Sequence, residues 1–228
     1  MKHIKIKKMK FSKSILQRKL LLSILFLTVI LCPVLVSAQT QLKLEKIWAT
    51  ESVLQTPECV AIDYENDVLY VSNVNKDPWL LDGNGFISKL SFKGEVIELN
   101  WVKEMHGPKG MGVYKGFLYV ADIDAVYKIN TKNGKVAQRI PADPTFQLND
   151  ISISKNGTVY VSGSNCNKIF KIGKNELELF IEDVDNFDRP NGLLAEEDRM
   201  LALTSGSSIL YEIDYEKHTK RKLAGDLG

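Results

Sequence analysis

The sequence predicts an all-β fold, a β-propeller of four-stranded antiparallel blades with about four blades present. The first observation is a repeat: four segments of similar sequence begin at residues 57, 108, 148 and 190, which are 51, 40 and 42 residues apart. The second is that each repeat contains several short stretches rich in β-branched and aromatic residues. Repeats of roughly 40 to 50 residues with several strands each are typical of propeller blades. A β-sandwich or barrel with evenly spaced strands is the alternative, but it does not require whole motifs to recur.

The same order of strands is predicted in every repeat. The repeat opens with a strand such as 60–62 or 151–153. The second strand reads Leu-Tyr-Val or a variant of it, at residues 69–71, 118–120, 159–161 and 201–203. The third strand alternates in polarity, as half-buried strands do, at residues 87–90, 126–129, 169–172 and 209–213. A turn such as Lys93-Gly94 or Asn133-Gly134 precedes the fourth strand, as at 96–99 or 177–181.

Residues 1–38 predict a secretory signal peptide, which is followed by the propeller domain at residues 39–228. The first nineteen residues carry eight Lys or Arg and no acid, residues 20–36 are mostly apolar, and Ala38 is a small residue at the expected cleavage point. An uncleaved membrane anchor is the alternative, because about 17 apolar residues is the short limit for a spanning helix. With cleavage we expect an exported protein, periplasmic or extracellular, without a membrane span.

The net charge argues against a nucleic-acid partner, and the cysteine spacing argues against a disulfide. The chain has 30 basic and 28 acidic residues, and eight of the basic ones lie in the signal segment. The remaining domain has a net charge near −6, so no basic patch suggests nucleic acid. Cys59 and Cys166 lie in different repeats without Cys-x-x-Cys spacing, and we expect both thiols to be free.

The two ends of the domain predict an incomplete ring. Leu44 to Thr50 belongs to no repeat and is predicted to be the strand that completes the last blade. The fourth repeat ends near Leu223, five residues before the last residue of the sequence. We therefore expect a domain that is C-terminally incomplete and has exposed strand edges. A complete four-bladed propeller is the alternative.

One position of the repeat is expected to bring polar side chains from all four blades to one site. In a propeller the first strand of each blade lines the central channel, so the residue at its entrance points towards the axis. Here those residues are Glu58, Lys109, Asn149 and Asn191. One carboxylate and two amide oxygens suit a hard cation such as calcium or magnesium. The alternative is that both asparagines cap turns and that Glu58 is a solvated acid.

The motifs at residues 148–150 (Leu-Asn-Asp) and 190–193 (Pro-Asn-Gly-Leu) resemble those of the SMP-30/gluconolactonase-like family, which is related to strictosidine synthase-like proteins and paraoxonases. The resemblance covers residues 44–228. It implies a six-bladed propeller with one divalent cation, expected to be calcium, in the central channel. The metal ligands that the resemblance implies are Glu58, Asn149 and Asn191.

The chain departs from the family pattern in three places. The family's first acid stands before the proline, where this chain has Gln55, whereas Glu58 follows the proline. Lys109 places a cation beside the expected metal; it either binds a substrate carboxylate or phosphate, or is a strand-end lysine whose ammonium reaches solvent. The Asp-Gly motif that supplies the family's last ligand is absent, and Asp226 is the nearest candidate. The expected substrate-binding residues are Lys109 and Asp150.

Two functions follow from these patterns. The first is an exported metal-dependent hydrolase of lactones or related esters, in which a metal-activated water in the central channel attacks a small-molecule substrate. The second is a non-catalytic propeller that binds a ligand or a partner protein. In that case the long insertion around Asn73 to Gly85, which contains Trp79, is the expected contact region.

Overall fold

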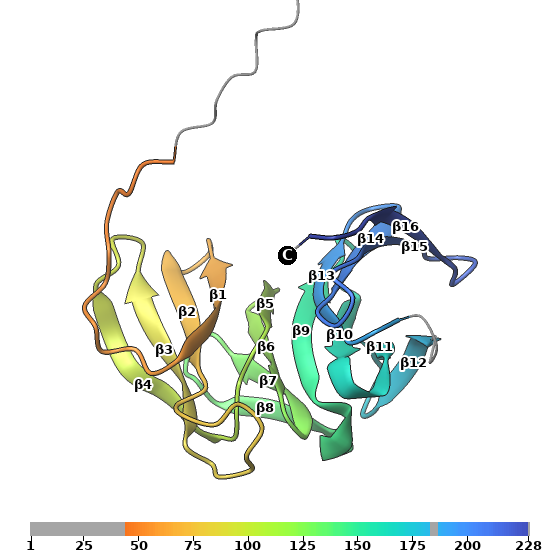
Figure 1. Cartoon of the computed structure of the whole chain (residues 1–228). Coiled ribbons are helices and arrows are strands. Elements are labelled where there is room, and N and C mark those ends of the chain that lie inside the picture. The colour runs from red at the N-terminus through yellow and green to blue at the C-terminus, as the bar shows by residue number, and fades with distance from the viewer. Residues whose placement is uncertain (1–43, 183–186, 228) are drawn as a thin grey trace, which may run out of the picture. The chain divides into compact units, whose positions relative to one another are not determined.

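The computed structural model describes residues 44–182 and 187–227, which form four antiparallel sheets of four strands each (Figure 1). Blade 1 contains β1 (Pro57–Asp63), β2 (Val68–Asn73), β3 (Gly85–Ser91) and β4 (Val96–Met105). Blade 2 contains β5 (Met111–Tyr114), β6 (Phe117–Asp122), β7 (Ala125–Asn130) and β8 (Val136–Pro141). Blade 3 contains β9 (Leu148–Ile153), β10 (Val159–Gly163), β11 (Lys168–Ile172) and β12 (Leu177–Glu182). Blade 4 contains β13 (Pro190–Ala195), β14 (Arg199–Thr204), β15 (Leu210–Asp214) and β16 (Lys220–Ala224). Short 3-10 helices at Pro144–Phe146 and Ser164–Cys166 flank β9 and β10.

The first strands of the four blades are neighbours. Within each sheet the strands pair in chain order, so every blade is a simple antiparallel meander. β1 contacts β5, β5 contacts β9, and β9 contacts β13, as Figure 1 shows. Four-stranded meanders that meet through their first strands are the arrangement of propeller blades, and this confirms the predicted fold class.

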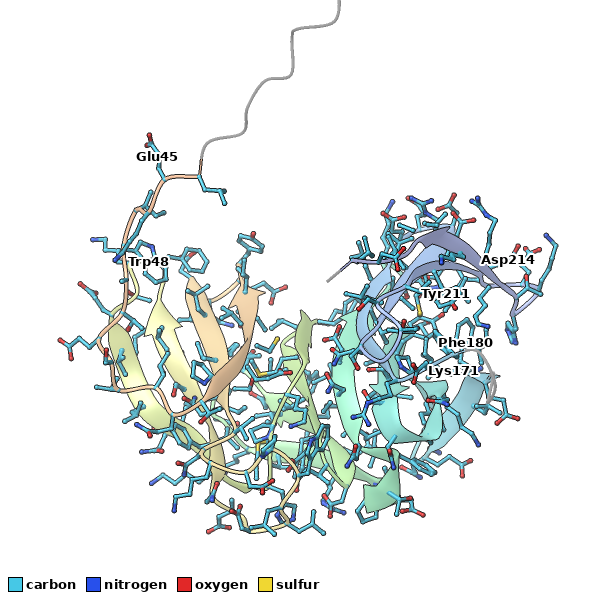
Figure 2. All side chains as sticks on the ribbon, viewed as in Figure 1. Glu45, Trp48, Lys171, Phe180, Tyr211 and Asp214 are labelled. Atoms are coloured by element: carbon cyan, nitrogen blue, oxygen red, sulfur yellow. The ribbon has the colours of Figure 1, made fainter. Side chains whose placement is uncertain are left out.

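Apolar side chains fill the space between successive blades. Because side chains alternate between the two faces of a strand, each sheet can pack one face against the preceding blade and the other against the next. Tyr70 and Ile87 of blade 1 share a cluster with Leu118 of blade 2. Phe180 of blade 3 and Tyr211 of blade 4 belong to another cluster and are labelled in Figure 2. The protein core is therefore divided among the blade junctions.

The glycines of the predicted turns adopt the backbone that glycine favours. Gly94 has a φ of 80° and Gly134 a φ of 70°, in the left-handed region. The Gly134 N–H donates to the carbonyl oxygen of Asn130 at 2.9 Å and closes the turn between β7 and β8. Both turns join the third and fourth strands of their blades, as predicted.

The predicted strands of all four repeats are observed, but one predicted strand is wrong. Residues 44–50 are described and form no strand. A β-strand requires the hydrogen bonds of a neighbouring strand, and no strand edge pairs with this segment among the described residues. The predicted signal peptide at residues 1–38 lies outside the described residues. In the part of the chain that the structure describes, no helix has the length and apolar character needed to cross a membrane.

Candidate functional site

The four residues predicted to face the channel lie at the same end of the neighbouring inner strands. Glu58, Asn149 and Asn191 are each the second residue of their strand, in β1, β9 and β13. Lys109 stands two residues before β5. The sequence repeat is therefore also a structural repeat at this position.

The backbone at these entrances is irregular in the same way in three blades. Pairing with the second strand of the blade shifts register at the entrances of β1, β9 and β13. The residue before each of these strands has a left-handed backbone: Thr56 (φ 50°), Gln147 (φ 51°) and Arg189 (φ 56°). Bulges redirect side chains, and left-handed backbone at residues other than glycine is a strained state that gathers at functional sites. These three entrances are the ones that carry the predicted metal ligands.

The Glu58 carboxylate is partly desolvated by the residues around it. The residue is exposed and makes no hydrogen bond or ion pair with the described residues. Burial of the carboxyl group by the surrounding protein raises the pKa of Glu58, the Lys109 ammonium lowers it, and Asp150 raises it further. Glu58, Lys109 and Asp150 therefore share one electrostatic neighbourhood, although they come from three different blades.

The side-chain amides of Asn149 and Asn191 likewise have no hydrogen-bond partner in the part of the chain that the structure describes. Asn149 is 6% exposed, and Asn191 is half-buried. Neither side chain hydrogen-bonds to any described residue, although the main chain of both is tied down: the Asn149 carbonyl accepts from the Gly110 N–H at 2.8 Å, and the Asn191 carbonyl accepts from Ser162 Oγ at 2.8 Å. Buried amides are normally hydrogen-bonded, so these two are available to a ligand.

Lys109 is buried beneath the insertion that follows β2. Only 2% of its surface is exposed, and Nζ donates to the carbonyl oxygen of Pro78 at 2.8 Å. Nζ also lies 4.1 Å from the centroid of the half-buried Trp79 ring, at cation–π distance. Burial lowers the pKa of Lys109, and nearby carboxylates, Glu58 first among them, oppose that shift. The ammonium is therefore held by a backbone carbonyl and the Trp79 ring and is hardly exposed, unlike that of a strand-end lysine that reaches solvent.

Asp150 joins blade 3 to blade 4. Its Oδ2 accepts from the Leu193 N–H at 2.7 Å, and its Oδ1 accepts from its neighbour, the Ile151 N–H, at 2.9 Å. Burial raises the pKa of the Asp150 carboxyl, and these two backbone hydrogen bonds reduce the shift. Both oxygens of Asp150 thus already accept backbone hydrogen bonds, one of them across the contact between β9 and β13, and the predicted substrate-binding role of Asp150 remains a prediction.

Cys59 has the equivalent role between blades 1 and 2. It occupies the same repeat position as Asp150, and the backbone of Met111 in blade 2 hydrogen-bonds to it. Burial, partly opposed by this hydrogen bond, raises the pKa of the Cys59 thiol to about 11. The third member of the position is Gly110, which has no side chain and instead brings its N–H to the Asn149 carbonyl. Cys59 and Cys166 are both free thiols.

We expect Asp150→Ala to lower the free energy of unfolding by about 1–3 kcal/mol, the cost of leaving a buried donor unsatisfied. The affected donor is the Leu193 N–H. Asp150→Asn keeps one acceptor oxygen and should lie between the alanine variant and the wild type. Urea unfolding of the three proteins measures the series. An unchanged midpoint in the alanine variant would contradict the role of Asp150 at this junction.

The side-chain oxygens at the strand entrances are of the chemical types that bind hard divalent cations. The carboxylate of Glu58 and the amide oxygens of Asn149 and Asn191 are the ligand types that calcium takes, and none has another partner among the described residues. The Lys109 ammonium is a like charge nearby, but it is directed to the Pro78 carbonyl and the Trp79 ring. No cluster of three or more His, Cys, Asp or Glu residues that could hold a metal occurs in the described ranges. Any metal held here therefore depends on the two asparagines.

Comparisons with known proteins support the fold. No family model matches the chain, and no curated protein matches it. Virginiamycin B lyase from Staphylococcus aureus is similar in structure, with a TM-score of 0.57, 12% identity, and coverage of 73% of this chain and 55% of the lyase. A catalytically inactive variant of that lyase, solved with quinupristin, gives a TM-score of 0.56 and 13% identity over 75% of this chain and 56% of the variant. A structure of the nidogen/laminin complex gives a TM-score of 0.60 and 11% identity, covering 76% of this chain and 64% of that one.

These likenesses are to six-bladed β-propellers and concern the fold alone, because the identities are near one residue in eight. The chain spans about half the length of the lyase that it matches. The relatives include both an enzyme and a protein solved in a complex with another protein, so the propeller fold does not by itself decide the function.

Proposed function

We propose that this protein is an SMP-30/gluconolactonase-like hydrolase of lactones or related esters that depends on a divalent cation, calcium in the first place. The observation that supports this most is the threefold coincidence at the inner-strand entrances. In β1, β9 and β13 the second residue carries a side-chain oxygen without a partner among the described residues, next to a register shift and a left-handed residue.

The residues at the entrances have separate roles in this proposal. Glu58 supplies the negative charge that attracts the cation, and the neutral oxygens of Asn149 and Asn191 complete a partial set of ligands, which leaves positions open for water and substrate. When bound, the cation would polarise the substrate carbonyl and lower the pKa of a bound water. Lys109 holds positive charge close to Glu58, where an anionic end of a substrate would be attracted once Trp79 moves.

The substrate is proposed to be a small molecule that enters at this end of the inner strands. In support, a related propeller, the inactive variant of virginiamycin B lyase, was solved with the small molecule quinupristin. Export to the periplasm or the extracellular space is part of the proposal and rests on the basic and apolar composition of residues 1–38.

The proposal is tested with calcium and a panel of simple lactones. We expect calcium to raise the melting temperature and to be required for lactone opening, and Asn191→Ala to weaken calcium binding at least tenfold, which corresponds to about 1.4 kcal/mol. Asn100→Ala is the matched control, because Asn100 is an exposed residue of β4. Wild-type protein that gains no stability from calcium and opens no lactone would rule out the proposal.

A second function, ligand or protein binding without catalysis, is favoured by the surface of the insertion after β2. Leu80 is 54% exposed and Leu81 is 47% exposed, directly after the half-buried Trp79. Adjacent exposed apolar residues are common in contact sites. Calcium binding without turnover of any ester, together with a partner whose binding is lost on Leu80→Asp, would favour this function over hydrolysis.

A further inference from the structure

A tyrosine recurs at one position of the repeat, and its surroundings differ between blade junctions. Tyr70 of β2 is fully buried at the junction of blades 1 and 2. Its hydroxyl lies 3.3 Å from Asp63 Oδ2 and 3.4 Å from the Thr131 carbonyl oxygen, and its ring stacks on Trp101 at 4.7 Å between centroids. This junction is closed, because the tyrosine hydroxyl has protein partners and the ring is covered.

The junction of blades 3 and 4 has the same plan with different side chains. Tyr160 of β10 takes the place of Tyr70, since Tyr160 pairs with Ser152 as Tyr70 pairs with Ala61. By the same register Ser154 takes the place of Asp63 and Phe180 that of Trp101. The ring centroids of Tyr160 and Phe180 are 5.0 Å apart.

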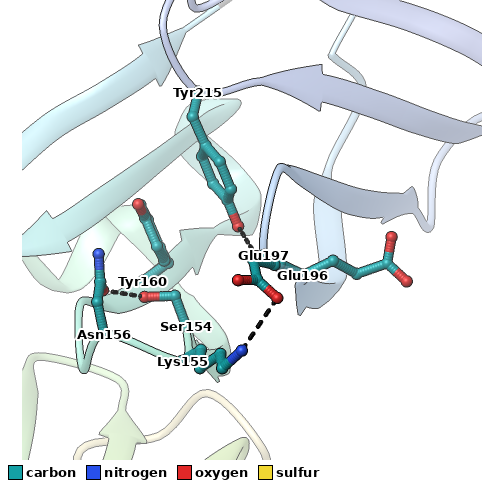
Figure 3. A pocket seen from close by; sticks show the side chains of 7 residues that line it. All are labelled: Ser154, Lys155, Asn156, Tyr160, Glu196, Glu197 and Tyr215. Carbon is teal, nitrogen blue, oxygen red and sulfur yellow. Dashed lines mark hydrogen bonds and ion pairs between the residues drawn. The ribbon is translucent and has the colours of Figure 1, made fainter.

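The second junction has Ser154 where the first has Asp63, and it differs at the tyrosine hydroxyl. Tyr160 is 8% exposed, yet its hydroxyl makes no hydrogen bond to the described residues. Beside it lies a cavity of about 450 Å³, within the range of small-molecule sites. Figure 3 shows its lining residues, which are Ser154, Lys155, Asn156, Tyr160, Glu196, Glu197 and Tyr215.

The polar groups of this cavity are neutral or already paired. Lys155 Nζ and Glu197 Oε2 form an ion pair of 3.1 Å between the two blades, and Glu196 is paired with Arg199. Asn156 Oδ1 accepts from Ser154 Oγ at 2.6 Å, which leaves the Asn156 amide N–H groups without a partner among the described residues. The groups without a partner among the described residues are thus the buried Tyr160 hydroxyl and the Asn156 amide donor, and the ion pair of Lys155 and Glu197 lies beside them.

The aromatic rings beside the cavity pack against one another. The ring of Tyr160 stacks on that of Tyr215 at 5.8 Å and 18°, and Phe180 contacts it edge-on. A ligand in the cavity can therefore hydrogen-bond to the Tyr160 hydroxyl and the Asn156 amide. Phenol, hydroxyl and amide groups both donate and accept hydrogen bonds, as the hydroxyl groups of a sugar do.

We propose that the cavity between blades 3 and 4 binds an uncharged saccharide of one or two units. The site is separate from the candidate metal centre, because Ser154 and Glu196 follow the ends of β9 and β13, whereas Asn149 and Asn191 lie at their starts. At about 3.3 Å per residue, the two sites lie on the order of 15 Å apart along the strands. The protein thus carries a carbohydrate subsite on the face opposite the strand entrances.

The test is a titration of the full chain that is monitored by NMR. The tyrosine rings are labelled with carbon-13, and a calcium chelator is present. The probes are glucose, galactose, N-acetylglucosamine and maltose, each added separately. We expect at least one to shift the Tyr160 and Tyr215 signals saturably while the Tyr70 signal stays in place. No saturable shift with any of the four sugars would overturn the proposal, as would saturable shifts only with acetate or putrescine, the charged probes.

Two variants assign the binding to the cavity. Tyr160→Phe keeps the ring and removes the free hydroxyl, and we expect it to weaken the sugar about tenfold. Asn156→Asp keeps the acceptor that Ser154 uses but removes the amide donor, and it provides the answer if Tyr160→Phe folds poorly. Tyr70→Phe is the matched control, since it removes the hydroxyl of the closed junction and should leave sugar binding unchanged. Equal affinity in wild type, Tyr160→Phe and Asn156→Asp would overturn the assignment.

Discussion

Gly110→Ala is expected to destabilise the protein by roughly 3 kcal/mol or more, at the upper end of what overpacking costs. A Cβ atom at Gly110 would lie 2.5 Å from the Cα of Asp150 and 2.6 Å from the backbone nitrogen of Ile151. Both atoms belong to the main chain of β9 and cannot rotate away. The Gly110 N–H also donates to the Asn149 carbonyl at 2.8 Å, so relief of the clash requires blades 2 and 3 to separate.

The repeat provides a matched control for this substitution. Gly192 holds the same motif position in blade 4, and a Cβ atom there would meet only the Leu203 Cβ at 3.8 Å, an ordinary contact. We expect Gly192→Ala to change stability by less than about 1 kcal/mol. Urea unfolding of both variants makes the comparison. Equal losses of stability would show that the motif requires the backbone freedom of glycine, and that the close approach of β9 is not the reason for Gly110.

The strands were predictable because local pattern and repeat agree. The second strand, with the sequence Leu-Tyr-Val or a variant of it, recurs in all four repeats, and the turns at Lys93-Gly94 and Asn133-Gly134 recur in the first two. The structure confirms these strands and turns. Leu44 to Thr50 also has strand-like composition, but composition does not supply a pairing partner, and the prediction there was wrong. The role of Gly110 was not predictable, because its close neighbour Asp150 is forty residues away in the sequence.

The positions of the candidate site residues were predictable, but their partners were not. The repeat placed Glu58, Asn149 and Asn191 at equivalent entrances, and the structure bears this out. The cover of Trp79 over Lys109 depends on the path of a long insertion, which no periodic pattern describes. The left-handed residues before the strands were missed for a similar reason, since none of the three is a glycine.

The cavity beside Tyr160 left a signal in the sequence. Tyr70 and Tyr160 occupy the same place in the second strand of their repeats. The corresponding residue near the end of the first strand is Asp63 in one repeat and Ser154, which directly follows the strand, in the other. The sequence difference alone does not show that the Tyr160 hydroxyl lacks a partner, because that conclusion depends on the contact between Asp63 and Tyr70 in the structure. In a repeat protein, the structure of one repeat therefore helps to interpret the sequence differences in the other repeats.

Glu58→Gln should have opposite effects on stability without and with calcium. The folded protein raises the pKa of Glu58 above its ordinary value of 4.5, chiefly by desolvation. A carboxyl group with a raised folded pKa imposes no penalty at pH values below its unfolded pKa. The penalty grows as the pH rises from there through the folded pKa. Without calcium, the glutamine variant should therefore be the more stable protein at pH 7, and this advantage should disappear near pH 4.

Calcium should reverse that order, because the carboxylate that weakens the free protein is the charge that attracts the cation. At a calcium concentration one hundred times the dissociation constant, binding adds about 2.7 kcal/mol to the stability of the wild type. Glu58→Gln should lose most of this gain, whereas Glu98→Gln, which alters an exposed acid of β4, should keep it. Unfolding curves with chelator and with calcium at pH 7 measure the crossing. A variant more stable than wild type under both conditions would mean that Glu58 is desolvated for a reason other than calcium, and the neighbouring Lys109 would become the group to examine.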